Sequence, residues 1–182
     1  MTNVKSYTTD QLLSRVKAIK GFKTIPDVYW GIFVRSTEDE NNTFDDKFYL
    51  FKGEVSVSVS SCTTNKGNSG TAVMKSDQWC YETHQVGLHR GKMKALRQVK
   101  GVEYFRDTNQ NGKTDETGTI YTDIIYMNIH GSTYNKGSKQ VSTKIGEWSH
   151  GCLVFDKNEY YESFIKLVEP QKNFSYCLLK EF

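Results

Sequence analysis

The 182-residue sequence has few prolines and no long run of apolar residues. It contains 2 prolines, and no segment approaches the roughly 18 consecutive apolar residues that predict a membrane-spanning helix. The first 20 or so residues include no apolar h-region and no small-residue cleavage site of the kind found in signal peptides. We therefore expect no membrane span and no signal peptide, and we expect the protein to be synthesised in the cytoplasm.

Neither sign of charge is in large excess. The chain has 24 basic and 21 acidic residues, a net charge of +3, which is too small to predict nucleic-acid binding. Aromatic residues reach 13%, and 11 of the residues are tyrosine. Aromatic and β-branched side chains pack well on pleated sheets, so this composition favours a sheet-rich fold. The length fits a single domain with a sizeable core.

The four cysteines follow no C-x-x-C or zinc-ribbon spacing. Because no export signal is seen, we expect free thiols. A Cys62–Cys80 disulfide is the alternative if the protein acts outside the cell.

Hydrophobic periodicity predicts a mainly β (α+β) protein with a helix near each end. Leu12, Leu13, Val16 and Ile19 recur at helical spacing, which predicts a helix over residues 9–20. A second helix is expected to begin near residues 156–158 and to end before Pro170. Alternating or apolar segments predict strands, and the Thr-, Asn- and Gly-rich segment 62–70 predicts a surface loop. The expected strands are 29–35, 47–52, 54–61, 71–74, 79–83, 95–99, 102–106, 124–129, 152–155 and 174–179.

Two short segments carry residues suited to nucleophilic catalysis. His130 directly follows the apolar run 124–129, and Cys152 begins a second apolar run. Strand ends in one sheet can lie side by side, which would bring the imidazole close enough to the thiol to accept its proton. Gly131 and Gly151 leave room for a substrate, and backbone N–H groups at residues 151–152 would stabilise an oxyanion.

The sequence Ser149-His150-Gly151-Cys152, preceded by His130-Gly131, resembles the L,D-transpeptidase (YkuD-type) catalytic domain. This resemblance implies that Cys152 attacks a peptide carbonyl while His130 accepts the thiol proton. It also implies that the Gly131 carbonyl orients His130, that Ser149 and His150 shape the site, and that the fold is an antiparallel β-sandwich.

The chain departs from the family pattern in two places. His130 lies 22 residues before Cys152, a longer gap than the family usually has, and the additional residues fall in the loop 134–144. Two residues after the nucleophile the family usually has Arg or Asn, and this chain has Val154. Hydrolysis in place of transpeptidation, or a loss of catalysis, is therefore an open alternative.

The resemblance predicts a single catalytic domain over residues 1–182, with the N-terminal helix as an appendage. The predicted function is a cysteine-dependent acyl-transferase or peptidase that acts on peptidoglycan stem peptides in the periplasm or cell wall, without a metal or other cofactor. The alternatives are a phage-borne or injected wall hydrolase of the same fold and a non-catalytic wall-binding or structural module.

A second polar segment, which includes His89, Arg90 and Lys92, is a candidate for substrate binding. These side chains would offer positive charge to substrate carboxylates, although a plain surface turn explains the same residues. Trp148 would stack on a sugar ring, or it would pack its loop against the sheet.

Two further segments resemble metal sites without completing one. Cys80, His84 and His89 lack a fourth ligand and the usual zinc spacing. Residues 107–115 match the first nine positions of a calcium loop, but Gly118 stands where that loop needs its bidentate acid. We expect no zinc site, and a turn in preference to a calcium site over residues 107–115.

Overall fold

A computed structural model describes residues 5–38, 40–109 and 111–182. Within these residues, eight strands close into a barrel and three others form a small second sheet. In barrel order, the strands are β1 (Tyr29–Arg35), β11 (Phe174–Lys180), β5 (Gln78–His89), β6 (Met93–Gln98), β9 (Ile129–Gly131), β10 (Leu153–Phe155), β3 (Val55–Thr63) and β2 (Asp46–Lys52). The small sheet contains β4 (Ala72–Met74), β7 (Val102–Arg106) and β8 (Tyr121–Asp123).

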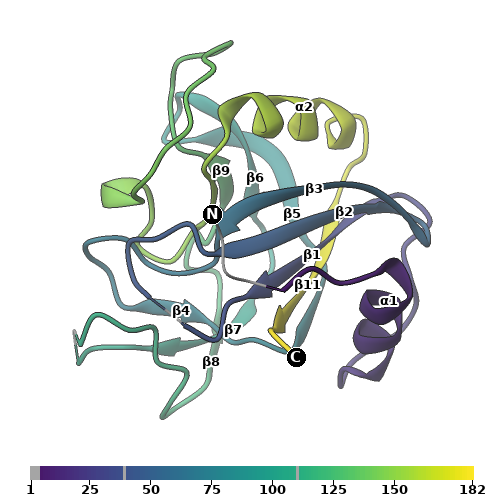
Figure 1. Cartoon of the computed structure of the whole chain (residues 1–182), viewed down its shortest axis with the longest axis horizontal. Coiled ribbons are helices and arrows are strands. Elements are labelled where there is room, and N and C mark those ends of the chain that lie inside the picture. Colours follow the sequence, from purple (N-terminus) through teal and green to yellow (C-terminus); the bar gives the residue numbers. More distant parts are fainter. Residues whose placement is uncertain (1–4, 39, 110) are drawn as a thin grey trace.

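Two α-helices and one short 3₁₀ helix complete the structure. They are α1 (Thr9–Ala18), α2 (Asn158–Val168) and η1 (Gly146–Trp148). Figure 1 shows α1 and α2 on different sides of the barrel. The small sheet lies beside another side of the barrel. No helix in the described part of the chain is long and apolar enough to cross a membrane. The predicted mainly β fold with a helix near each end is confirmed.

The main sheet differs from the expected antiparallel sandwich in being a closed, mixed barrel. β1 pairs with β11 and β9 pairs with β10 in parallel, and the other neighbours are antiparallel. The β9–β10 pair positions the candidate site, because each of these strands carries one of the two predicted catalytic segments.

Strand alternation divides the apolar side chains between two cores. In β1, Phe33 points into the barrel, where it joins a core that also includes α2. Trp30, Ile32 and Val34 point outward and pack against α1. Helix α1 is therefore held by the outer face of the barrel, through Leu12, Leu13 and Val16.

A capping box at Thr8 begins α1 at Thr9, the residue at which the helix was predicted to start. The Thr8 hydroxyl accepts a hydrogen bond from the Gln11 backbone at 3.2 Å, and the Gln11 side chain accepts one from the Thr8 backbone at 2.8 Å. The helix ends at Ala18, two residues before the predicted end at residue 20.

The predicted strand over residues 124–129 is wrong except at Ile129. The Gln98 side-chain oxygen accepts hydrogen bonds from the backbone of Ile125 (3.1 Å) and Met127 (2.9 Å), in place of a neighbouring strand. Tyr126, which lies between them, has a φ of 60° and interrupts the extended conformation. The segment is therefore held by a side chain and forms no ladder.

The predicted surface loop at residues 62–70 is wrong over its first half, because residues 62–66 are buried. One of them, Thr64, contacts the guanidinium of Arg35, which is itself fully buried. Arg35 donates to the Thr64 hydroxyl (2.8 Å), the Thr64 carbonyl (3.0 Å) and the Met74 carbonyl (2.8 Å), and it pairs with the Glu116 carboxylate at 2.6 Å.

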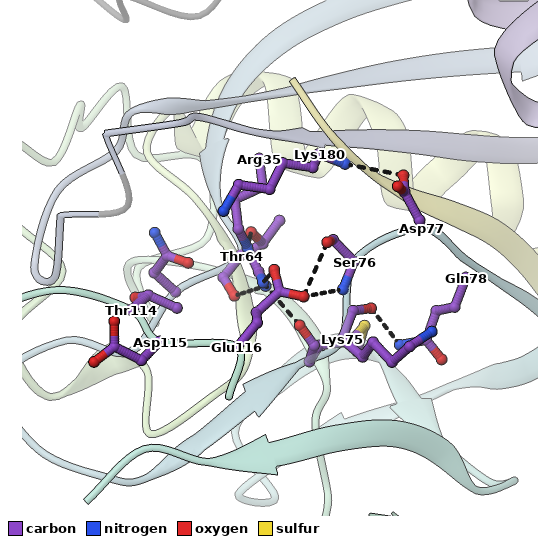
Figure 2. A network of polar contacts seen from close by, with 12 residues as sticks. Arg35, Thr64, Lys75, Ser76, Asp77, Gln78, Thr114, Asp115, Glu116 and Lys180 are labelled. Carbon is purple, nitrogen blue, oxygen red and sulfur yellow. Dashed lines mark hydrogen bonds and ion pairs between the residues drawn. The ribbon is translucent and has the colours of Figure 1, made fainter. Parts of the chain in front are cut away.

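Glu116 links this network to the small sheet. Figure 2 shows its carboxylate between Arg35 and Ser76, whose backbone N–H and hydroxyl both donate to it. Burial pushes the pKa of Glu116 upward, but the charge of Arg35 and the Ser76 donors outweigh that effect and hold the pKa below its usual value. Glu116 is therefore a carboxylate at neutral pH, and it balances a buried cation.

We predict that Glu116→Gln destabilises the protein by about 3 kcal/mol or more, because it leaves the buried Arg35 without its ion-pair partner. Urea unfolding at neutral pH measures this loss. The control is Glu54→Gln, which removes an exposed ion pair with Lys17 and is expected to cost less than about 1 kcal/mol. Equal losses in the two variants would show that the buried pair has no special weight.

Candidate active site

The parallel pairing of β9 and β10 brings the two predicted catalytic segments together. In this register His130 is opposite Val154, and Cys152 is the residue just before β10. Neighbouring strands lie about 4.8 Å apart and two residues span about 6.6 Å, so the Cα atoms of His130 and Cys152 are about 8 Å apart. Alternation places both side chains on one face. The structure therefore brings the predicted nucleophile and base to adjacent positions.

The His130 imidazole is fully buried and held in one orientation. Its Nδ1 lies 2.7 Å from the Gly131 carbonyl oxygen, which can only accept, so Nδ1 carries the proton. Nε2 is then an unprotonated acceptor. It is buried, and no residue that the structure describes donates a hydrogen bond to it. The ring stacks on His89 at 4.0 Å between centroids and faces Trp148 at 6.3 Å.

The turn before Cys152 depends on glycine and on Ser149. Gly151 has a φ of 139°, and a Cβ there would lie 2.7 Å from the Ala72 carbonyl oxygen. The buried Ser149 hydroxyl lies 2.8 Å from the Cys152 carbonyl and accepts the Gly151 N–H at 3.1 Å. Of the two N–H groups predicted to stabilise an oxyanion, that of Gly151 is therefore already engaged.

The thiol and the imidazole are both neutral at rest. Burial raises the pKa of Cys152 to about 11, although the Asn128 backbone and the charge of Arg90 oppose this. Burial and the neighbouring His89 lower the pKa of His130 to about 3. The Cys152 Sγ lies 3.6 Å from the Tyr126 carbonyl oxygen, to which the thiol donates. Both groups are therefore uncharged at neutral pH.

Cys152 opens onto a pocket of about 320 Å³ that is positively charged. Arg90 and Arg97 line it, and none of the described residues that line it is acidic. Arg90 and Gly91 both have positive φ (49° and 70°), which forms the tight turn between β5 and β6. That turn holds Arg90 at the pocket. The lining residues are Leu88, His89, Arg90, Arg97, Tyr126, Asn128, Trp148, His150 and Cys152.

The predicted substrate-binding residues divide between two pockets. His89, Arg90 and Trp148 line the Cys152 pocket. Lys92 lines a neighbouring pocket of about 320 Å³, where its ammonium lies 5.2 Å from the centre of the Tyr134 ring. Lys92 is therefore separated from the thiol by the hairpin turn.

The second histidine of the motif lies at the rim. The His150 Nε2 lies 3.2 Å from the Glu147 carboxylate and 3.0 Å from the Ser69 hydroxyl, and more than half of its side chain is exposed. It lines the pocket without being part of the buried pair. Val154 is fully buried within β10, so the position of the family's Arg or Asn is here part of the core.

Four pocket residues were missed in the sequence: Leu88, Arg97, Tyr126 and Asn128. The Asn128 amide donates to His89 Nδ1 at 3.2 Å and so fixes the ring that stacks on His130. The hairpin register could have revealed Arg97, because odd-numbered residues on the two sides of the 90–91 turn share a face with His89. No local pattern marks Tyr126 or Asn128.

The residues considered as metal ligands or as a disulfide make other contacts in the structure. His84 donates from Nε2 to the Met127 carbonyl at 2.7 Å, and all four cysteines are free. In the calcium-like segment, the Asn109 and Asn111 amides donate to Asp115, and Asp107 pairs with the buried Lys66 ammonium at 2.7 Å. The acidic side chains of this turn are thus paired with donors from the chain itself.

Comparisons with known proteins give one distant match. No family model matches the chain, and no curated protein matches it. Among solved structures, it is similar to the helical cell shape determining protein Pgp2 from Campylobacter jejuni, with 17% identity and a TM-score of 0.33. The match covers 96% of this chain and 56% of that one, so the chain spans little more than half the length of that protein. The likeness assigns no chemistry to this chain.

We predict that iodoacetamide labels Cys152 alone in the native protein, because Cys62, Cys80 and Cys177 are fully buried. The rate should rise about tenfold per pH unit between about pH 7 and pH 9, since the reactive thiolate is scarce below a pKa of about 11. Peptide mass spectrometry after timed quenching measures this, with Cys152→Ser as the control. A rate already at its plateau near pH 6 would indicate a thiolate–imidazolium pair and contradict the neutral resting state.

Proposed function

We propose that this chain is a cysteine-dependent acyl-transferase or peptidase that acts on peptidoglycan stem peptides, in the periplasm or cell wall. The observation that carries this proposal is the pairing of β9 with β10: His130 is fixed through Nδ1 with Nε2 unprotonated, and Cys152, two residues before the strand position opposite His130, opens onto a pocket. We also propose that residues 1–182 act as one catalytic domain.

In the proposed mechanism, the Cys152 sulfur attacks a peptide carbonyl while its proton moves to Nε2 of His130. The imidazolium that results donates this proton to the leaving amine as the peptide bond breaks, which leaves an acyl group on Cys152. Water or an acceptor amine then attacks the acyl group, His130 accepts its proton, and the sulfur departs as a thiol. The Cys152 N–H is the donor that we assign to the oxyanion, since the Gly151 N–H is engaged by Ser149.

The charge of the pocket supports a peptide substrate with a free carboxylate. The planar guanidinium groups of Arg90 and Arg97 suit the planar, two-oxygen geometry of a carboxylate. The resemblance of residues 149–152 to the YkuD-type motif supports peptidoglycan stem peptides as the proposed substrate class. His150 and Trp148 form the remaining rim of the pocket.

We predict that incubation with purified muropeptides gives a product that Cys152→Ala does not form, and that His130→Gln forms about 10²–10⁴ times more slowly. Mass spectrometry distinguishes the reactions, because water and an amine acceptor give products of different mass. Cys177→Ala is the control, since Cys177 packs beneath α1 and is expected to leave turnover intact. Turnover by Cys152→Ala at the wild-type rate would end the proposal.

Arg90→Gln is expected to raise the KM of a stem peptide about tenfold or more, because a charge-assisted hydrogen bond to the carboxylate contributes about 1.5–3 kcal/mol. Thermal unfolding should show an intact fold, and the iodoacetamide reactivity of Cys152 should persist. Lys166→Gln, in the neighbouring pocket, is the matched control. Equal KM values for wild type and Arg90→Gln would exclude this role for Arg90.

A further inference from the structure

Another pocket lies away from Cys152 and is rich in carboxylates. It has a volume of about 830 Å³ and is lined by the segment before β2, by β3 and by the loop around Val141. Asp45, Glu38 and Glu40 come from the first of these segments, and Asp156 comes from the end of β10. The catalytic proposal uses none of these residues.

Three buried side chains in this pocket have oxygen atoms without hydrogen-bond partners. Both carboxylate oxygens of Asp45, the Oδ1 of Asp156 and the hydroxyl of Ser60 have no hydrogen-bond partner of normal length and angle among the described residues. The three residues are 8%, 7% and 5% exposed. Unpartnered buried acceptors are costly and rare in folded proteins, so their gathering in one pocket indicates a missing donor.

Neighbouring groups satisfy these oxygens only in part. The Thr43 hydroxyl and the backbone of residues 40 and 45 lower the pKa of Asp45, but burial and the neighbouring Asp46 outweigh them. The Thr43 hydroxyl also lies 2.9 Å from the Glu40 carbonyl and donates there. The Ser61 hydroxyl donates to the other oxygen of Asp156, at 2.6 Å. The pocket thus keeps an excess of acceptors that a ligand could satisfy.

The lining favours an organic cation over a metal ion. Phe44, Val59 and Val141 give the pocket apolar walls, and its volume far exceeds that of a single ion. Among residues 5–38, 40–109 and 111–182, no group of three or more metal-ligating side chains is arranged to hold a metal. An ammonium group offers three donors, and an aliphatic stem would cover the apolar walls.

We propose that this pocket binds a ligand with a primary ammonium group on an aliphatic stem, which donates hydrogen bonds to Asp45, Asp156 and Ser60. The ligand is either a free diamine or a lysine-type side chain of a peptide. The site is separate from the catalytic one: Cys152 and Asp156 lie at opposite ends of β10, about 13 Å apart along the strand. The proposal does not depend on the activity of Cys152.

The charges around Asp45 make this binding dependent on pH. Burial and the neighbouring Asp46 raise the pKa of Asp45 to about 7. Glu38, Glu40 and Lys47 face it from its own segment, and Asp156 and Lys157 from the β10–α2 connection. Below about pH 7 an ammonium ligand must displace the proton of Asp45, so the affinity should rise between about pH 5.5 and pH 8.

The test is isothermal titration of the full chain with 1,5-diaminopentane and with Nα-acetyl-lysine methylamide. Saturable binding of either amine at about pH 8 is expected, and the amine that binds identifies the source of the ammonium group. Asp45→Asn should weaken binding about tenfold or more, while Cys152→Ala and the exposed Asp27→Asn should bind as wild type does. Glutarate, which matches diaminopentane in length but has the opposite charge, should not bind.

Three results would overturn the proposal: no saturable binding of either amine, equal affinity of wild type and Asp45→Asn, or binding of Ca²⁺ or Mg²⁺ alone.

A stability measurement shows that Asp45→Asn is folded. The raised pKa means that Asp45 favours folding when protonated, and that this contribution is lost as the pH rises through about 7. Asp45→Asn should therefore unfold at a higher temperature than wild type at about pH 8 and lose this advantage near pH 5.

Discussion

The buried guanidinium of Arg35 organises the structure around the candidate site. It donates hydrogen bonds to the two oxygens of Thr64, and the residues that follow Thr64 contact the turn before Cys152. The Asn65 carbonyl accepts the Ser149 hydroxyl at 3.0 Å, and the Gly67 N–H donates to the Ser149 carbonyl at 2.8 Å. Ser149 in turn holds the backbone of Cys152. One charged side chain at the end of β1 is thus connected to the nucleophile through a short buried loop.

A second carboxylate completes this arrangement. Asp46 accepts hydrogen bonds from the Ser36 backbone and from both the backbone and the hydroxyl of Thr64. Burial raises the pKa of Asp46, and the charge of Arg35 opposes that rise. Two acids around one buried cation leave few ways to rearrange, because any other geometry would strand a charge without a partner. This explains how an irregular segment such as 63–67 can be buried.

Local patterns in the sequence predicted the elements whose formation depends on neighbouring residues. The alternation of valine and serine predicted β3, and the helical spacing of Leu12, Leu13 and Val16 predicted α1. Barrel closure could not be predicted in this way, because it depends on the pairing of distant segments with no shared pattern. The strand predicted at 124–129 failed for the same reason: a distant side chain, that of Gln98, takes up its backbone N–H groups.

The residues of the candidate site also fall into those that local motifs predicted and those that depend on distant pairing. His130 and Cys152 could be found because each lies in a contiguous motif, and the parallel pairing of β9 and β10 brings the two motifs together. Arg97 and Asn128 reach the pocket only through the register of β6 and the contact with His89. The neutral state of the thiol and imidazole was also outside the reach of the sequence, since it results from their burial.

The parallel pairing of β1 with β11 has a consequence for how the protein folds. Trp30 pairs with Ser175, so the barrel joins segments from near the two ends of the chain. Such a pairing requires closure of a very long loop, whose entropic cost comes before any gain from the contact. During synthesis, β1 and β2 must therefore wait for β11 to leave the ribosome, and their apolar faces are uncovered until it does. We expect slow folding with a high contact order, in which the addition of β11 completes the core.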